Sequence, residues 1–219
     1  MSSRLILYKP VHKITLLIAL SIVLSPVNLY AQKFTAKTLF KLGVQYIEKS
    51  EYSQAIDAFK QAVKLKPDYA EAYYNLGHAY YNLHRYTEAS DAYKEAVKVN
   101  PNFVEAYVSL GIVSHMLSRY DAAIEAFKKA VKLKPNHAEA LYNIGQVYNE
   151  LKRYEESVGV FKKAVEVKSN FAEAHYNLGI AYLELKEKDL ASARKEYEIL
   201  KTLNSDLAEE LLNLIKAKK

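Results

Sequence analysis

The sequence contains no cysteine, and this absence removes several classes of protein at once. A disulfide-stabilised scaffold, a thiolate metal site, a cysteine nucleophile and a lipid-modified N-terminal cysteine are all excluded. Common enzyme motifs are missing too, because there is no glycine-rich phosphate loop, no Gly-x-Ser-x-Gly turn and no His-Glu-x-x-His pair. We therefore expect neither an enzyme nor a bound cofactor.

The chain also lacks a strong charge of either sign once its first residues are set apart. The formal net charge is +6, but the first 31 residues contain three basic side chains and no acidic ones. The remaining residues hold 28 basic and 25 acidic side chains, spread through every segment. Because nucleic-acid-binding proteins gather basic side chains on one face or stripe, we expect no nucleic-acid partner.

Residues 1–31 follow the order of a secretory signal peptide. Basic side chains precede an uncharged apolar run at 14–24, and Ala31 offers a small residue for cleavage. The basic residues are Arg4, Lys9 and Lys13. The run is shorter than the roughly 20 residues that span a bilayer. We expect export to the periplasm or the exterior of a bacterium; the alternative is that residues 14–27 stay uncut and anchor the protein to the inner membrane.

A spacing of 34 residues governs the rest of the chain. Five glycines and three prolines recur at this interval, namely Gly43, Gly77, Gly111, Gly145 and Gly179, and Pro67, Pro101 and Pro135. Two residue types held in one register indicate internal repeats. After a lead-in at 32–35, the spacing defines repeats one to five as residues 36–69, 70–103, 104–137, 138–171 and 172–205.

Each repeat is predicted to fold as two helices. In repeat two, Tyr73, Leu76 and Tyr80 have the spacing of one face of a first helix. A polar break follows, and a second helix then runs to the proline, since the residue before proline disfavours the α region. Residues 206–219 are predicted to form a C-terminal capping helix and a basic tail. The expected apolar face of this cap consists of Leu207, Leu211, Leu214 and Ile215.

This pattern resembles the tetratricopeptide repeat. That family has a large residue at repeat position 4, leucine at 7, glycine at 8, tyrosine at 11, alanine at 20, an aromatic residue at 24, alanine at 27 and proline at 32. Repeat two has Tyr73, Leu76, Gly77, Tyr80, Ala89, Tyr93, Ala96 and Pro101 at these positions. The resemblance covers residues 36–205. It implies an all-α fold, a right-handed α-solenoid of about five helix-turn-helix repeats plus the capping helix.

The last two repeats depart from the pattern. In repeat four, Ser157 replaces a small alanine, Gly159 lies inside the second helix and Ser169 replaces the proline. An interior glycine costs about 1 kcal/mol relative to alanine, so this second helix is expected to be a weak point. Repeat five needs two extra residues within 186–190 before its second helix realigns.

Helical geometry divides the first helix of each repeat into two arcs. At about 100° per residue, positions 4, 7, 8 and 11 cover the arc that packs between helices. Positions 2, 5, 6, 9, 12 and 13 cover the opposite arc, which the resemblance places in a concave groove. The candidate ligand-binding residues on it are Tyr74, Asn75, His78, Tyr81, Glu105, His115, Glu139, Tyr142, Asn143, Gln146, Tyr176 and Asn177.

These residue types suit a peptide ligand. Asparagine amides both donate and accept hydrogen bonds, similar to the asparagine ladder of some peptide-binding members of the family. Tyrosines offer rigid contact area, and glutamates favour a ligand with lysine or arginine over an acidic one. The plainer interpretation is that the asparagines and glutamates serve only helix stability and solubility.

Two other kinds of site are not expected. The family's carboxylate clamp grips acidic chaperone tails and needs lysine at position 5 with basic residues at positions 2 and 6. Here position 5 is aromatic or valine, and position 2 is mostly glutamate. A metal site would have to combine His78 and His115 with a third ligand such as Glu105, and ordinary groove polarity is the simpler explanation.

The sequence therefore predicts a non-enzymatic scaffold for protein–protein interaction in the cell envelope. It would hold an extended peptide or a partner's helix in the concave groove, with no small-molecule substrate. The alternative is a structural subunit of an envelope complex that packs through the convex face or the ends of the solenoid.

Overall fold

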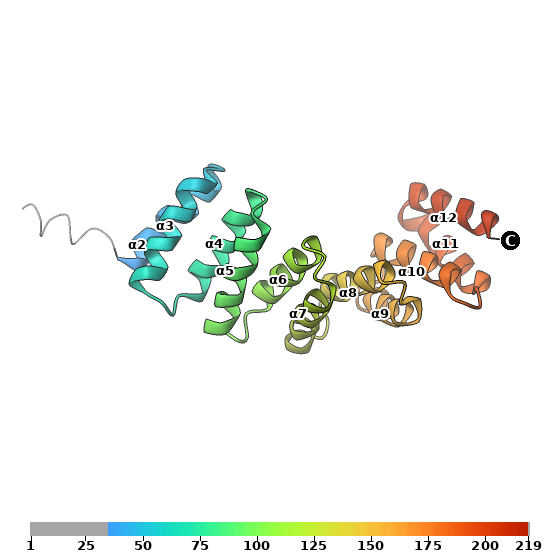
Figure 1. Ribbon diagram of the computed structural model, residues 1–219. Helices are drawn as coiled ribbons and strands as arrows, with labels where there is room; N and C mark the ends of the chain where they lie inside the picture. The colour runs from blue at the N-terminus through green and yellow to red at the C-terminus, as the bar shows by residue number, and fades with distance from the viewer. Residues whose placement is uncertain (1–34, 219) are drawn as a thin grey trace, which may run out of the picture. The chain divides into compact units, whose positions relative to one another are not determined.

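The structure, a computed structural model, describes residues 35–218. Eleven helices and no strand occur in this range (Figure 1). The predicted signal peptide and nearly all of the lead-in, residues 1–34, lie outside the described residues. Among the described helices, none has the length and apolar character needed to cross a membrane.

The helices form five consecutive pairs followed by a single helix. The first helices are α2 (Ala36–Glu48), α4 (Ala70–Asn82), α6 (Val104–Met116), α8 (Ala138–Glu150) and α10 (Ala172–Glu184). The second helices are α3 (Tyr52–Leu65), α5 (Tyr86–Val99), α7 (Tyr120–Leu133), α9 (Tyr154–Val167) and α11 (Leu190–Leu203). The final helix is α12 (Ser205–Ala217).

The chain divides into two compact parts, Met1–Pro67 and Asp68–Lys219. In the first part, α2 packs against α3. In the second part, each first helix packs on its own second helix, and each second helix packs on the first helix of the next repeat. The helix α12 packs on both α10 and α11. The all-α class, the five helix pairs and the capping helix are confirmed.

One contact joins the two helices of each of the first four repeats. The aromatic ring at position 24 lies directly against the glycine at position 8. The pairs are Gly43 with Phe59, Gly77 with Tyr93, Gly111 with Phe127 and Gly145 with Phe161. These rings are almost completely buried. A Cβ atom on Gly145 would lie 2.6 Å from Phe161 Cε1, so only glycine allows the ring this close to the backbone of the first helix.

The turn between the two helices of a repeat has a fixed conformation. Ser50, His84, Ser118 and Lys152 have φ values between 55° and 59°. This left-handed residue ends the first helix and reverses the chain direction. Repeat five has no such residue in its turn; instead Asp189 caps α11 by accepting a hydrogen bond from Ser192 N–H at 2.9 Å. The two extra residues of this repeat thus replace one turn type by another.

Repeat five is also completed differently. Its glycine, Gly179, faces Leu211 of α12, and a Cβ on the glycine would lie 2.5 Å from Leu211 Cδ2. Tyr197, the aromatic residue expected there, lies half-buried beside α12 instead. The cap buries Ala208, Leu211 and Ile215. The expected apolar face is therefore wrong at Leu214, which is 37% exposed, because the face that packs is centred one residue away.

The departures of repeat four are mostly accommodated. Ser157 is fully buried, and its hydroxyl donates to the carbonyl of Gly145 at 3.1 Å. The carbonyl of Ser169 accepts a hydrogen bond from His175 Nε2 at 3.0 Å. Gly159 is exposed inside a continuous α9, with no atom within 4 Å of the place a Cβ would take. Of the three departures, only this glycine leaves the helix without compensation.

A buried ion pair links α10 to α11. His175 Nδ1 lies 2.6 Å from Glu196 Oε2, and both side chains are at least nine-tenths buried by residue. Burial alone lowers the pKa of His175, but the hydrogen bonds to Glu196 and to the Ser169 carbonyl outweigh it and raise the pKa above its ordinary value. Repeats two and three have Tyr73 or Tyr107 at the histidine's position and an alanine at the glutamate's.

Two glycines of repeat four should respond oppositely to alanine. Gly159→Ala should raise the free energy of unfolding by about 1 kcal/mol, since it removes helix-interior glycine without a clash. Gly145→Ala should lower it by roughly 1–3 kcal/mol, because Phe161 must move. Urea denaturation of the two variants and the wild type measures both. A stabilising Gly145→Ala would contradict the ring-on-glycine packing.

Stability should also depend on pH through His175. Because its folded pKa is raised, the histidine contributes stability that is full below its unfolded pKa of about 6.5 and is lost as the pH rises through the folded value. The matched control is His175→Tyr with Glu196→Ala, which restores the residues of repeat two. Melting temperatures between pH 6 and pH 8.5 should fall more steeply for the wild type. Parallel curves would show that the pair does not titrate as described.

Candidate functional site

The predicted residues lie on the first helices, and in the second compact part these helices face inward. There α6 contacts α8 and α8 contacts α10, whereas no comparable contact joins two second helices among the described residues. When only one row of helices is in direct contact, that row lies on the inner side of the curve. The surface formed by α4, α6, α8 and α10 is called the inner face below.

Two candidate tyrosines of the inner face take part in packing. The ring of Tyr74 lies 5.7 Å from that of Tyr93 and 5.0 Å from that of Phe103. Tyr142 repeats this arrangement at 5.7 Å from Phe161 and 4.9 Å from Phe171. The expectation that this arc is not needed for packing is therefore wrong at position 5, because a tyrosine ring is long enough to reach between helices. Both rings remain half-exposed.

A polar network joins α8 to α10 around Tyr142. Its hydroxyl accepts hydrogen bonds from Gln146 Nε2 and, at 3.3 Å, from Asn177 Nδ2. Asn177 Nδ2 also donates to the carbonyl of Glu173 at 2.8 Å. Both amide hydrogens of Asn177 and both lone pairs of the hydroxyl are thus used. Among the described residues, nothing binds the Asn177 carbonyl or accepts the Tyr142 hydroxyl hydrogen, so one acceptor and one donor stand side by side.

The other candidate asparagines differ from one another. Asn75 Nδ2 donates to the carbonyl of Glu71 at 2.7 Å, as Asn177 does to Glu173. Asn143 forms no hydrogen bond with another described residue. Tyr176 lies half-buried on α10, where burial and then hydrogen bonding with Glu210 raise its pKa. The asparagines thus offer their carbonyls more readily than their amide hydrogens.

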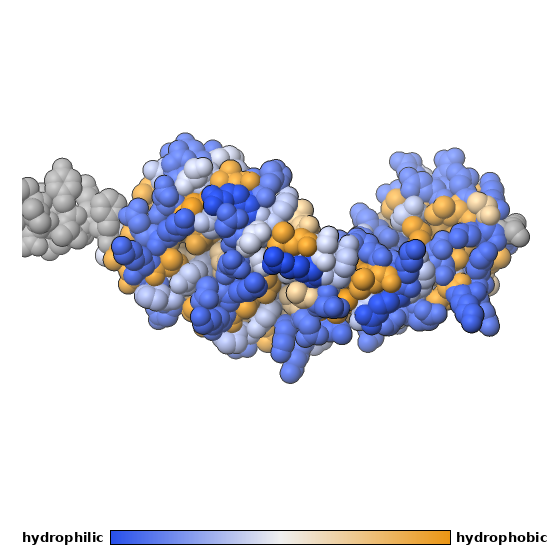
Figure 2. All heavy atoms as spheres, in the orientation of Figure 1, coloured by the Kyte–Doolittle hydropathy of each residue, from blue (hydrophilic) through white to orange (hydrophobic). Residues whose placement is uncertain are grey.

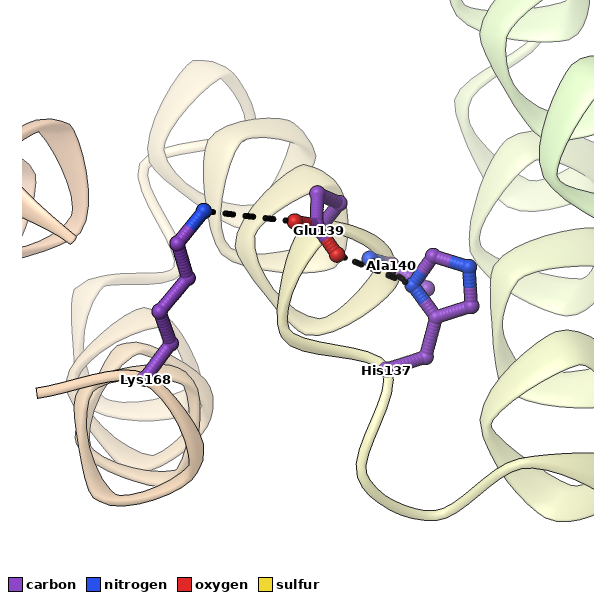
Figure 3. A network of polar contacts seen from close by, with 4 residues as sticks. All are labelled: His137, Glu139, Ala140 and Lys168. Atoms are coloured by element: carbon purple, nitrogen blue, oxygen red, sulfur yellow. Dashed lines mark hydrogen bonds and ion pairs between the residues drawn. The ribbon is translucent and has the colours of Figure 1, made fainter.

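The candidate glutamates are not equivalent. Glu139 lies between two basic groups, with Lys168 Nζ at 3.4 Å and His137 Nδ1 at 3.3 Å (Figure 3). A backbone hydrogen bond and then the contact with Lys168 lower the pKa of this carboxyl. Glu105 is exposed and makes no ion pair with any described residue. The free negative charge of the inner face therefore lies at Glu105 rather than at Glu139.

The candidate histidines are held apart by their own partners. His115 Nε2 lies 2.8 Å from Glu150 Oε1, which connects α6 to α8. His78 is half-buried on α4, and desolvation lowers its pKa, so the ring is neutral at pH 7. Within residues 35–218 no group of three histidines or carboxylates is placed to hold a metal ion.

A cavity opens on the inner face between α4, α5 and α6. Its volume is about 150 Å³, and its walls are His78, Tyr81, Tyr93, Ser109 and Ile112. The structure thus brings together two predicted residues, His78 and Tyr81, with three others. Ser109 and Ile112 lie on the arc considered above but were not selected, and Tyr93 was assigned to packing alone.

The sequence signal for this cavity is a pair of substitutions in different repeats. Position 6 is Ser109, whereas repeats two, four and five have asparagine there. Position 24 is Tyr93, whereas repeats one, three and four have phenylalanine. Because these residues belong to neighbouring repeats, their contact follows only from the packing of α5 on α6.

Comparisons with known structures agree with this architecture. A crystal structure of MamA has 26% sequence identity and a TM-score of 0.70, and the match covers 76% of this chain and 96% of that one. YrrB, described as a TPR protein with an unusual peptide-binding site, has 21% identity and a TM-score of 0.73 over 86% of this chain and 97% of its own. The first TPR of Spaghetti, bound to the HSP90 peptide SRMEEVD, has 25% identity and a TM-score of 0.52 over 55% and 94%.

Comparison with curated protein sequences gave no match. A family model described as the Cilia and flagella-associated protein 70 C-terminal domain matches residues 19–210, which is most of the chain. The helix pairs, the glycine–ring contacts and the structural neighbours agree with this match. The chain is a tetratricopeptide-repeat protein and belongs to the family of the Cilia and flagella-associated protein 70 C-terminal domain.

Proposed function

We propose that the protein is an exported scaffold that binds an extended peptide segment of a partner protein along its inner face. The observation that carries this proposal is the free carbonyl of Asn177 beside the free hydroxyl hydrogen of Tyr142. A peptide group presents one N–H and one C=O, and this pair offers a partner for each. The function is therefore binding and not catalysis.

The chemistry of the inner face favours a ligand with basic side chains. Glu105 and Glu173 are exposed there, and no described residue forms an ion pair with either. Complementary charge guides encounter and excludes partners of like charge. Half-buried tyrosines such as Tyr74 add rigid contact area beside these carboxylates.

A solved relative supports the binding mode but not the same ligand. The first TPR of Spaghetti is bound to a peptide that contains two adjacent glutamates and ends in aspartate. The present chain has Glu71, Glu105, Glu139 and Glu173 at position 2 of four repeats, where a grip on acidic tails requires basic residues. We therefore infer a peptide partner of opposite charge.

An alternative function is assembly through the second helices. Leu133 and Val167 are each 39% exposed near the ends of α7 and α9. Figure 2 shows apolar surface in separate patches, divided by hydrophilic atoms, on the face that it displays. Patches of this kind suit a subunit that packs within a larger complex, and the experiment below separates this function from peptide binding.

Partner capture should depend on the inner face. The variant Glu105→Lys with Tyr142→Phe keeps the tyrosine ring but removes one charge and one hydrogen-bond donor. We expect about a tenfold loss in captured partner, from about 1.4 kcal/mol in all. The measurement is crosslinking and pull-down from an envelope extract with the full chain as bait, followed by mass spectrometry.

The matched control places the same two changes on second helices, as Glu125→Lys with Tyr154→Phe. Capture should be retained by this control and lost by the inner-face variant, after circular dichroism has shown equal helicity. The opposite pattern would transfer the interface to the second helices and support assembly. Equal capture by all three proteins would remove the inner face from the interface.

Export rests on the first 31 residues, and we propose that they are cleaved after Ala31. The intact mass of the protein from a bacterial envelope fraction should then correspond to residues 32–219. Replacing Ala31 by a large residue, as in Ala31→Phe, should slow cleavage and leave more full-length chain. A full-length mass for the wild type, in the membrane fraction, would favour the uncut anchor.

A further inference from the structure

The cavity between α4, α5 and α6 differs from the rest of the inner face in shape. In the equivalent places of other repeats, an asparagine stands at position 6 and a phenylalanine at position 24. Here the short side chain of Ser109 leaves space above the ring of Tyr93, which is only 2% exposed. The volume of about 150 Å³ is close to that of an apolar cavity of about 150 Å³ known to hold benzene.

The walls of the cavity contain no ionised group. Tyr81 and Ile112 provide apolar surface, and His78 is neutral because burial lowers its pKa. Burial, with smaller contributions from neighbouring groups, raises the pKa of Tyr93, so its hydroxyl stays protonated and interacts with the Ser109 hydroxyl at the base of the cavity. A charged side chain would lose its hydration here without gaining an opposite charge.

Negative charge lies just outside the cavity. Glu105 precedes Ser109 by one helical turn, so the two side chains share one face of α6. This carboxylate is exposed and makes no ion pair with any described residue. A ligand residue next to the one in the cavity therefore meets an acidic rim.

We propose that this cavity receives one uncharged apolar side chain, between leucine and phenylalanine in size, from a bound peptide that has lysine or arginine beside that residue. The proposal rests on the proposed function and names the ligand class for one position of the inner face. Repeat three supplies the selectivity through Ser109, while the neighbouring repeats hold the peptide backbone.

The test uses labelled peptides Gly-Lys-Ala-X-Ala-Lys-Gly, in which X is phenylalanine, leucine, alanine or glutamate. Fluorescence anisotropy with the full chain gives the dissociation constant of each peptide. Phenylalanine and leucine should bind about 10- to 100-fold more tightly than alanine, because one apolar side chain becomes buried. Glutamate should bind most weakly.

Ser109→Leu fills the cavity with its own side chain and should bring all four peptides to the affinity of the alanine peptide. Ser109→Asn, which introduces the residue of three other repeats, should act in the same direction while keeping the fold. The matched control is Thr87→Leu, which adds the same side chain at an exposed position of α5. It should keep the wild-type order of affinities.

The possible outcomes separate the cavity from the inner face as a whole. Peptides that all bind equally well, and that ignore Ser109→Leu, would overturn the cavity proposal and leave peptide binding intact. No binding of any peptide to the wild type would overturn both. Loss of the phenylalanine preference in Ser109→Leu but not in Thr87→Leu would establish the cavity as a side-chain site.

Discussion

The rest of the structure depends on the contact between one aromatic ring and one glycine in each of the first four repeats. The ring of Phe161 lies where the side chain of residue 145 would be, so the two helices of repeat four come as close as their backbones permit. Burial of such a ring contributes about 1.5–3 kcal/mol. The same contact determines how the first helix is rotated, and thereby which of its residues reach the inner face.

Much of the fold was predictable because it follows from a period. Glycines and prolines at 34-residue spacing locate both helices of a repeat, and the first helices begin at the first residue of each predicted repeat. The cap was less predictable, since Leu211 and Leu214 both fit an apolar face and only packing on α10 selects Leu211. Handling of the extra residues in repeat five likewise depends on a cap at Asp189 that the period does not contain.

The site was harder to predict than the fold. The division into arcs uses angle alone, so it ignored the length of Tyr74 and Tyr142, which reach phenylalanines at the repeat boundary. It also treated Glu105 and Glu139 alike, whereas Lys168 approaches only the second. Contacts between repeats decide these differences, and a register that aligns repeats with one another does not show them.

The inner face combines uniform support with local variation. Packing residues are nearly the same in each repeat, whereas position 6 is asparagine in three repeats and Ser109 in the other of the second part. A change at such a position alters the surface without disturbing the glycine–ring contact beneath it. This separation lets one fold select different ligands.

The substitution of Leu211 for a ring in repeat five has a consequence for synthesis on the ribosome. In repeats one to four, the glycine and its ring are 16 residues apart, so each pair of helices can close soon after it emerges. Gly179 must wait for a residue 32 positions later. The carboxyl-terminal repeat is thus the last to become resistant to proteases, and a chain interrupted before α12 carries an unfinished end that quality control can recognise.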